Sequence, residues 1–220
     1  SDMLDPGEPK FRRRKADRPG EIVHAAMAVF AERGFAAAKL EEIAKRAGVS
    51  KGALYLYFET KEDIFRAVVD RAIAPNMQAI RAMIAAHPGP LSDLLRLVAE
   101  RIGILMETLP VGGVVKMVIA EAGNFPELAR VWHDDLIAVA LGGLTEAIAA
   151  AQARGEVRKG DPRTFALEVI SPMLVGLIWR ETFVPVGAKP FDLPAVARQH
   201  MEVMIDGLAA RRPKDGEAAA

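Results

Sequence analysis

The polar side chains best suited to bind a ligand gather between residues 50 and 61. Both tyrosines of the 220-residue chain, Tyr55 and Tyr57, lie in this window together with Lys51 and Lys61. Tyrosine hydroxyls and lysine ammonium groups bond phosphate oxygens, and a lysine at a helix start can also bond a guanine edge. These residue types therefore favour contact with double-stranded DNA.

The residues around this window predict two short helices joined by a tight turn. Gly48 can take the left-handed conformation that ends a helix, and the hydroxyl of Ser50 can cap the next helix. Leu54 and Phe58 are four residues apart, so both can anchor one face of that second helix. The other face stays outward, as in a helix-turn-helix that enters the major groove. Such helix pairs also occur in proteins that bind no DNA; the Ser-Lys-Gly start and Tyr-x-Tyr-Phe end favour DNA here.

A basic segment precedes the first predicted helix. The chain has 29 basic and 29 acidic residues, so its formal net charge is zero, but positive charge is concentrated near the start. The cluster consists of Lys10, Arg12, Arg13, Arg14, Lys15 and Arg18. We expect residues 1–17 to be a flexible basic arm, which either stays in solvent or lies along phosphates or in a minor groove.

Apolar residues recur at helical spacing along the chain, and no segment alternates as a half-buried strand would. The sequence therefore predicts an all-α fold. Thr60 should cap a fourth helix, which Pro75 kinks or ends. The other expected helices are 18–33, 40–47, 51–58, 76–87, 91–108, 112–122, 126–154, 162–184 and 192–210. We expect a DNA-binding domain at 18–65, a larger helical domain at 66–210 and a disordered tail at 211–220.

The composition excludes several classes of protein. Cysteine is absent, so the chain has no disulfide framework and no thiolate metal site. The longest strongly apolar run, Val169 to Trp179, is too short to span a bilayer, and no secretory signal pattern is present. We therefore expect a cytoplasmic protein with no membrane partner.

Residues for catalysis or metal binding are scattered. The four histidines are His24, His87, His133 and His200. No nucleophile elbow, phosphate-binding glycine loop or convincing pair of catalytic carboxylates is present, so we expect no enzyme and no cofactor. One alternative is a metal site built from His133, Asp134, Asp135 and Glu121, although a polar helix face explains these residues more simply.

Residues 18–65 resemble the DNA-binding domain of the tetracycline-repressor (TetR) family. The motifs that carry the resemblance are Phe30 with Gly34-Phe35, Ile43-Ala44…Ala47-Gly48-Val49-Ser50, Gly52-x-Leu54-Tyr55-x-Tyr57-Phe58, and Lys61. The resemblance implies a homodimeric transcription regulator, usually a repressor, that a small ligand releases from a palindromic operator.

The resemblance also implies which residues contact DNA. Carried over by position, they are Lys51, Gly52, Ala53, Tyr55, Leu56, Tyr57 and Lys61, with Ser50 capping the recognition helix. The chain departs from the family just before the second helix, where members commonly have Thr or Ser and this sequence has Ala38 and Lys39. Our hypothesis is that Lys39 replaces the lost hydroxyl contact by charge.

The last two predicted helices are the best candidates for a dimer interface, because small residues such as Ser171 and Gly176 allow close approach. The expected interface residues are Met173, Leu174, Leu177, Ile178, Val196, Met201, Met204 and Ile205. Ordinary core packing is the alternative for this set.

Methionines and aromatic residues of the larger domain are candidates for an effector site, since Met adapts to varied apolar ligands. The candidate set is Met83, Leu105, Met106, Met117, Phe125, Trp132, His133, Val139 and Trp179. Any one of them is more often core than pocket. We expect a mostly apolar effector held by one or two polar groups. A second hypothesis is a DNA-binding dimer with no small effector, which a protein partner switches or which acts architecturally; a buried cavity would distinguish the two.

Overall fold

The computed structural model describes residues 18–210; the predicted basic arm and the predicted tail lie outside this range. The described residues form helices and no strand, apart from one isolated bridge between Val157 and Ala209, so the all-α prediction is confirmed. The α-helices are α1 (Arg18–Arg33), α2 (Leu40–Ala47), α3 (Lys51–Tyr55), α4 (Lys61–Val68), α5 (Ala74–Ala86), α6 (Leu91–Thr108), α7 (Val111–Glu121), α8 (Pro126–Trp132), α9 (Ala138–Ala153), α10 (Pro162–Thr182) and α11 (Leu193–Leu208).

Two π-helical turns each join two consecutive α-helices into one continuous helical stretch. Val69–Ile73 (η1) continues α4 into α5, and His133–Ile137 (η2) continues α8 into α9. Pro75 lies in the first turn of α5, where a missing N–H costs nothing, so it does not end the chain's helical course. A short 3₁₀ turn, Val184–Val186 (η3), follows α10.

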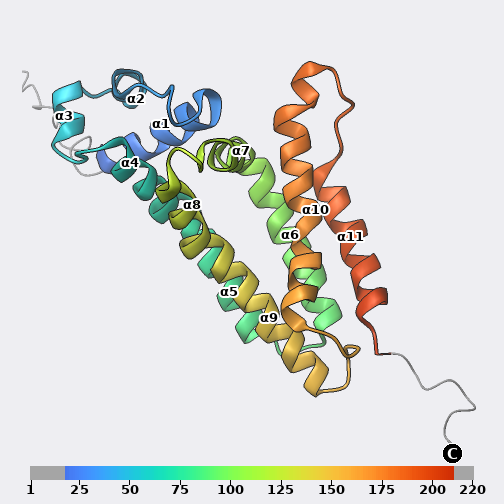
Figure 1. Ribbon diagram of the computed structural model, residues 1–220. Coiled ribbons are helices and arrows are strands. Elements are labelled where there is room, and N and C mark those ends of the chain that lie inside the picture. The colour runs from blue at the N-terminus through green and yellow to red at the C-terminus, as the bar shows by residue number, and fades with distance from the viewer. Residues whose placement is uncertain (1–17, 211–220) are drawn as a thin grey trace, which may run out of the picture.

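Helices α1 to α4 form the small domain at the upper left of Figure 1. Its core is aromatic: the Phe30 ring centroid lies 5.5 Å from that of Phe35 and 6.1 Å from that of Phe65. Thr60 caps α4 by accepting from the amide of Asp63, whose side chain in turn accepts from the Thr60 amide. The expected domain boundary after residue 65 falls inside α4, which continues to Val68.

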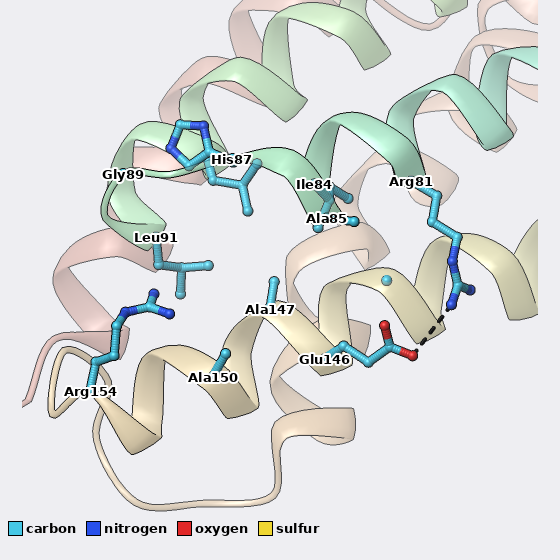
Figure 2. Close-up of a pocket in the computed structure, with 12 residues that line it drawn as sticks. Arg81, Ile84, Ala85, His87, Gly89, Leu91, Glu146, Ala147, Ala150 and Arg154 are labelled. Carbon is cyan, nitrogen blue, oxygen red and sulfur yellow. Dashed lines mark hydrogen bonds and ion pairs between the residues drawn. The ribbon is translucent and has the colours of Figure 1, made fainter.

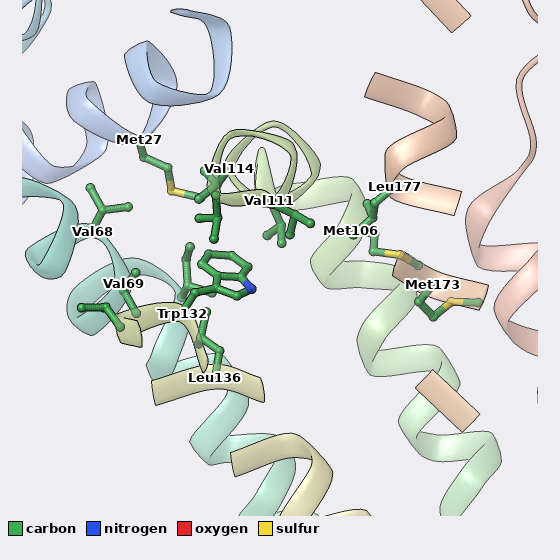
Figure 3. Packing of buried hydrophobic residues seen from close by; sticks show 14 of the residues in the cluster. Met27, Val68, Val69, Met106, Val111, Val114, Trp132, Leu136, Met173 and Leu177 are labelled. Atoms are coloured by element: carbon green, nitrogen blue, oxygen red, sulfur yellow. The ribbon is translucent and has the colours of Figure 1, made fainter. Parts of the chain in front are cut away.

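The larger domain consists of α5 to α11. Helix α5 runs beside α9, α11 packs on α6, and α7 lies between α1 and α10 (Figure 1). Buried residues of both domains form one continuous cluster. In Figure 3, Trp132 of α8 lies among Val69, Val114 and Leu136, which come from three different elements. The small domain is therefore seated on the larger one through shared core packing.

Two helical stretches are more apolar than the longest apolar run in the sequence suggested. By length and composition alone, Pro126–Ala153 and Pro162–Val186 would each be able to cross a membrane. Each helical stretch is apolar on average, although a few polar residues interrupt it. Only 28% and 17% of these windows, respectively, is buried within the protomer. Much apolar helix surface, above all on α10, is thus left outside the core.

Candidate nucleic-acid interface

The turn between α2 and α3 has the geometry that the sequence predicts. Gly48 is left-handed, with φ of 69°, and the amide of Val49 donates to the carbonyl of Ala44 at 3.0 Å. Ser50 Oγ then accepts from the amide of Ala53 at 3.0 Å and caps α3. Leu54 is fully buried and fixes α3 on the small domain's core. The predicted helix-turn-helix is therefore present, although α3 ends at Tyr55 rather than at residue 58.

The outer face of α3 and of the two residues that follow it combines aromatic, aliphatic and basic groups. Leu56 is 82% exposed, Tyr55 and Tyr57 are each more than 40% exposed, and Gly52 also lies at the surface. Ala53 is half-buried beneath them. Large apolar surface is normally hidden, so this combination on a short helix marks a face that meets a partner.

Lys51, at the start of α3, forms an exposed ion pair with Glu41 of α2. The hydrogen bond between them raises the pKa of Lys51 and lowers that of Glu41. Both side chains remain about half or more exposed, at 49% and 61%, so the pair can exchange with a phosphate.

The start of α2 lacks a side-chain cap, as the departure from the family pattern predicts. Lys39 occupies the N-cap position in extended conformation, and its side chain caps none of the described backbone amides. It is exposed, whereas Ala38 is buried. Lys39 is therefore free to turn its ammonium group toward solvent.

Lys61 has a different environment from the one predicted. Its Nζ donates to the carbonyls of Phe35 at 2.7 Å, Ala36 at 3.2 Å and Ala38 at 3.2 Å, and it lies 4.7 Å from the Phe35 ring centroid. An ammonium group has three hydrogens to donate, and these three carbonyls account for all of them. The structure thus places Lys61 against the α1–α2 loop, and its phosphate contact stays a prediction.

The residues predicted to line an effector site are not brought into one cavity. Met106, Met117 and Trp132 are at most 8% exposed and belong to the packed core. Met83 and Leu105 line a surface groove of about 290 Å³ between α5 and α6. Core residues and groove residues both lie on apolar helix faces. Their spacing along the sequence therefore cannot distinguish a core position from a groove position.

The remaining candidates make contacts of other kinds. The Phe125 ring packs edge-on against Phe35, with 4.9 Å between centroids, and so joins the two domains. His133 is exposed and bonds Asp134, while Val139 is half-buried. Trp179 donates its indole N–H to the Lys189 carbonyl at 3.0 Å and packs against Phe183 and Phe191.

Sequence reasoning missed a hollow of about 320 Å³ between the α5–α6 corner and α9 (Figure 2). Its walls are mainly Ile84, Leu91 and Ala147, with Arg81 and Arg154 at its edges. Arg81 pairs with Glu146 at 3.3 Å and Arg154 pairs with Glu156 at 2.7 Å, so both charges are already balanced. No motif marks these residues, because they come from the ends of three separate helices.

The alternative metal site is not formed within residues 18–210, where no group of three or more metal-ligating side chains meets. Glu121 instead accepts hydrogen bonds from the backbone amides of Phe35 and Ala36. This contact between the two domains had no signal in the sequence beyond a glutamate at a helix end.

Three residues predicted for a dimer interface are buried inside the protomer. Met173, Leu177 and Met201 are at most 7% exposed, because they pack α10 and α11 onto the rest of the domain. Little of these side chains is left for a partner to cover, and their role at an interface stays a prediction. Leu174 is 44% exposed, and the other predicted residues, Ile178, Val196, Met204 and Ile205, are half-buried.

The same two helices expose apolar residues that the prediction omitted. Leu167, Val175 and Val203 are each more than half exposed. Leu167, Leu174 and Val175 are spaced along one face of α10, and we refer to these three residues as the α10 stripe.

Comparison with known proteins identifies both domains. The family model for bacterial regulatory proteins of the tetR family matches residues 22–68, and that for the AefR-like transcriptional repressor C-terminal domain matches residues 93–205. The chain belongs to the TetR family of transcriptional regulators. The resemblance of residues 18–65 is thereby confirmed, as is the role in transcription regulation through a DNA-binding helix-turn-helix.

Among its relatives, this TetR-family protein is 29% identical over 212 residues to the HTH-type transcriptional repressor BepR of Brucella suis biovar 1 (strain 1330). That match covers 91% of this chain and 97% of BepR. Solved structures with the same fold include FadR of Bacillus subtilis in complex with stearoyl-CoA, with a TM-score of 0.69 and 22% identity over 86% of this chain and 98% of FadR. A SmeT–triclosan complex has a TM-score of 0.69 and 24% identity over 90% of this chain and 93% of SmeT.

Proposed function

We propose that this TetR-family regulator represses transcription by binding a palindromic operator as a homodimer, and that an apolar small molecule releases it. The observation that carries the proposal is the outer face of α3 and the turn after it, where Tyr55, Leu56 and Tyr57 are exposed while Leu54 holds the helix in place. Lys39, just before α2, and Lys51, the first residue of α3, add positive charge at the starts of these two helices. Tyrosine and lysine would position the protein on phosphates, and the start of α3 would read base edges.

The α10 stripe supports a dimer. Three large aliphatic side chains, exposed on one helix with no polar tips, are costly to leave in water. A second copy of α10 and α11 packed on them would give an isologous interface, and a two-fold dimer matches a palindromic operator. We propose Leu174, Ile178, Val196, Met204 and Ile205 for this interface together with the exposed Leu167, Val175 and Val203.

An apolar effector is supported by two hollows of suitable size and by the relatives. The α5–α6 groove and the α5–α9 hollow each measure about 300 Å³, near the lower limit for small-molecule sites. FadR was solved with stearoyl-CoA and SmeT with triclosan. Met83 lines the α5–α6 groove and could repack to widen it, because Met side chains adapt at low cost.

The alternative is a DNA-binding dimer that a protein partner switches. The buried state of Met106, Met117 and Trp132 favours it, since the centre of the larger domain is filled by the protein's own side chains. A thermal-shift screen with fatty acids, acyl-CoA esters and apolar drugs separates the two: a saturable rise in unfolding temperature supports an effector. Because a transcription regulator must reach DNA, we expect the protein to act in the cytoplasm.

DNA binding is tested by fluorescence anisotropy on the fragment upstream of the protein's own gene, beside scrambled DNA, at several salt concentrations. Tight binding to the upstream fragment that Tyr55→Ala weakens would support the proposal. Val186→Ala, which changes an exposed residue far in sequence from the recognition helix, serves as the control. Equal, strongly salt-dependent binding to both fragments would contradict sequence-specific recognition of that fragment.

A further inference from the structure

The loop between α1 and α2, residues 34–38, is held by a carboxylate from the other domain. Glu121, the last residue of α7, accepts from the Phe35 amide at 2.5 Å through Oε2 and from the Ala36 amide at 2.8 Å through Oε1. Consecutive backbone N–H groups after a left-handed residue, here Gly34 with φ of 78°, form a concave anion-binding site. Glu121 occupies that site with both of its oxygens.

The opposite side of the same loop is held by a cation. The carbonyls of Phe35, Ala36 and Ala38 all accept from Lys61, which belongs to the small domain. The loop thus lies between a carboxylate on its N–H side and an ammonium on its C=O side. Hydrogen bonds to charged groups are shorter and stronger than neutral ones, so this loop is fixed more firmly than a surface turn normally is.

Close packing leaves little room for α7 to slide on α1. A Cβ at Gly113 of α7 would lie 2.8 Å from Ala31 Cβ and 2.9 Å from the Ala31 carbonyl oxygen, so α1 and α7 approach as closely as their backbones allow. A Cβ at Gly34 would lie 3.2 Å from Glu121 Oε2. The two helices are therefore in contact both along α7 and at its C-terminal end.

The other side of α7 contacts the C-terminal end of α10. Lys116 of α7 donates to the Glu181 carbonyl at 2.8 Å, and a Cβ at Gly112 would lie 2.7 Å from Glu181 Oε1. Arg180 of α10 bonds the Met106 carbonyl of α6 at 3.1 Å. Helix α7 is thus a rigid spacer between α1 of the small domain and α10, the helix that carries the α10 stripe (Figure 1).

We propose that Glu121 is a positioning residue for DNA binding: by holding the α1–α2 loop on α7, it sets the angle of the helix-turn-helix relative to α10. In a dimer formed through α10, that angle determines the spacing of the two recognition helices. The inference rests on the proposed dimeric function. It predicts that Glu121 matters for an operator that both recognition helices must reach, and not for contacts that each helix makes alone.

The chain offers a matched control across the same domain boundary. Glu127 of α8 pairs with Arg66 of α4, and both side chains are more than a third exposed. Such an exposed pair contributes little and fixes no backbone. Glu127→Gln and Glu121→Gln therefore make the same chemical change at two interdomain contacts, of which only one holds a loop.

The experiment measures the affinity of the full-length wild type, Glu121→Ala, Glu121→Gln and Glu127→Gln for the upstream operator fragment, for one isolated half-site and for scrambled DNA. We expect Glu121→Ala to lower operator affinity by about tenfold, in the range of typical coupling between sites. Affinity for the half-site and for scrambled DNA should stay within a factor of about two. Glu121→Gln keeps one acceptor and should retain part of the affinity, while Glu127→Gln should match the wild type.

Hydrogen exchange on the same variants separates positioning from general loss of structure. The amides of Phe35 and Ala36 should exchange faster in Glu121→Ala, with residues of α3 and α11 unchanged. Parallel loss of operator, half-site and scrambled-DNA affinity would overturn the inference, and so would unchanged operator affinity in Glu121→Ala. A wild type without preference for any tested DNA would overturn the proposed function as well.

Discussion

Two exposed apolar surfaces of this protein differ in what their side chains carry at their tips. On α3 and the turn after it, Tyr55 and Tyr57 end in hydroxyls and Lys51 adds a charge, so the surface can stay hydrated and meet a charged partner. On α10, Leu167, Leu174 and Val175 have no polar group, so that surface gains only by excluding water. The difference teaches that exposure alone does not identify a partner: polar tips favour phosphates and base edges, and an aliphatic stripe favours another protein surface.

The largest effect is expected where the α3 surface is anchored. Leu54→Ala should lower the free energy of unfolding by about 2–5 kcal/mol, because Leu54 is fully buried and its removal leaves a cavity. Leu56→Ala, at 82% exposure, should change it by less than about 0.5 kcal/mol. Urea unfolding of both variants checks this. Similar losses in the two would mean that α3 is not anchored by Leu54.

A charged substitution on the α10 stripe tests whether this aliphatic surface is buried in a dimer. Val175→Glu should shift the dimer–monomer equilibrium toward monomer by tenfold or more, since burying an unpaired carboxylate costs several kcal/mol, about 3 or more. Sedimentation or light scattering at several concentrations measures it. Ile104→Glu, on the equally exposed Ile104 of α6, is the control and should leave association unchanged. Equal effects would remove the distinction between the α10 stripe and ordinary exposed residues.

Lys61 and Lys51 are expected to differ in role: the first stabilises the fold and the second contacts phosphate. Lys61→Ala should destabilise the protein by about 1–3 kcal/mol, because three loop carbonyls lose a charged donor. Lys51→Ala should instead reduce the slope of log affinity for DNA against log salt by about 0.9, as expected for one lost phosphate contact. Unfolding curves and salt titrations of both variants are needed. A reduced slope in Lys61→Ala would support Lys61 as a phosphate contact.

The smallest effect concerns the π-helical turns η1 and η2, which contact each other. Burial raises the pKa of Asp70, and the neighbouring Asp135 carboxylate adds to the rise. The folded state therefore binds this proton more readily than the unfolded state, so Asp70 lowers stability as pH rises above its ordinary pKa of 3.8. Asp70→Asn should stabilise the protein at neutral pH, by less than about 0.5 kcal/mol because Asp70 remains largely solvated.

The gain from Asp70→Asn should shrink as pH falls through the folded-state pKa, where the wild-type carboxyl also becomes neutral. Thermal unfolding at pH 7 and near pH 4 measures both parts. In an Asp135→Asn background, the gain from Asp70→Asn should be smaller, because the neighbouring carboxylate is then absent. A gain that stays constant with pH would contradict the raised pKa of Asp70 in the folded state.

The helix-turn-helix was predictable because its signals act over a few residues. Ser50 bonds the amide three residues on, Thr60 does the same with Asp63, and Gly48 ends α2 through its own backbone conformation. Each of these contacts depends on residue type and spacing within one turn. The sequence therefore determined the elements of the small domain, the exposed face of α3 and the family.

The larger domain's surfaces and sites were decided by tertiary packing. Met106, Met173 and Leu174 are all large apolar residues of long helices, yet the first two are buried and the third is exposed. The sequence predicted Lys61 as a DNA contact and offered Glu121 as a possible metal ligand, but the fold places both against the α1–α2 loop. An apolar or charged residue carries no record of which distant helix it will meet, so core, dimer face, hollow and interdomain contact separate only when the helices are packed.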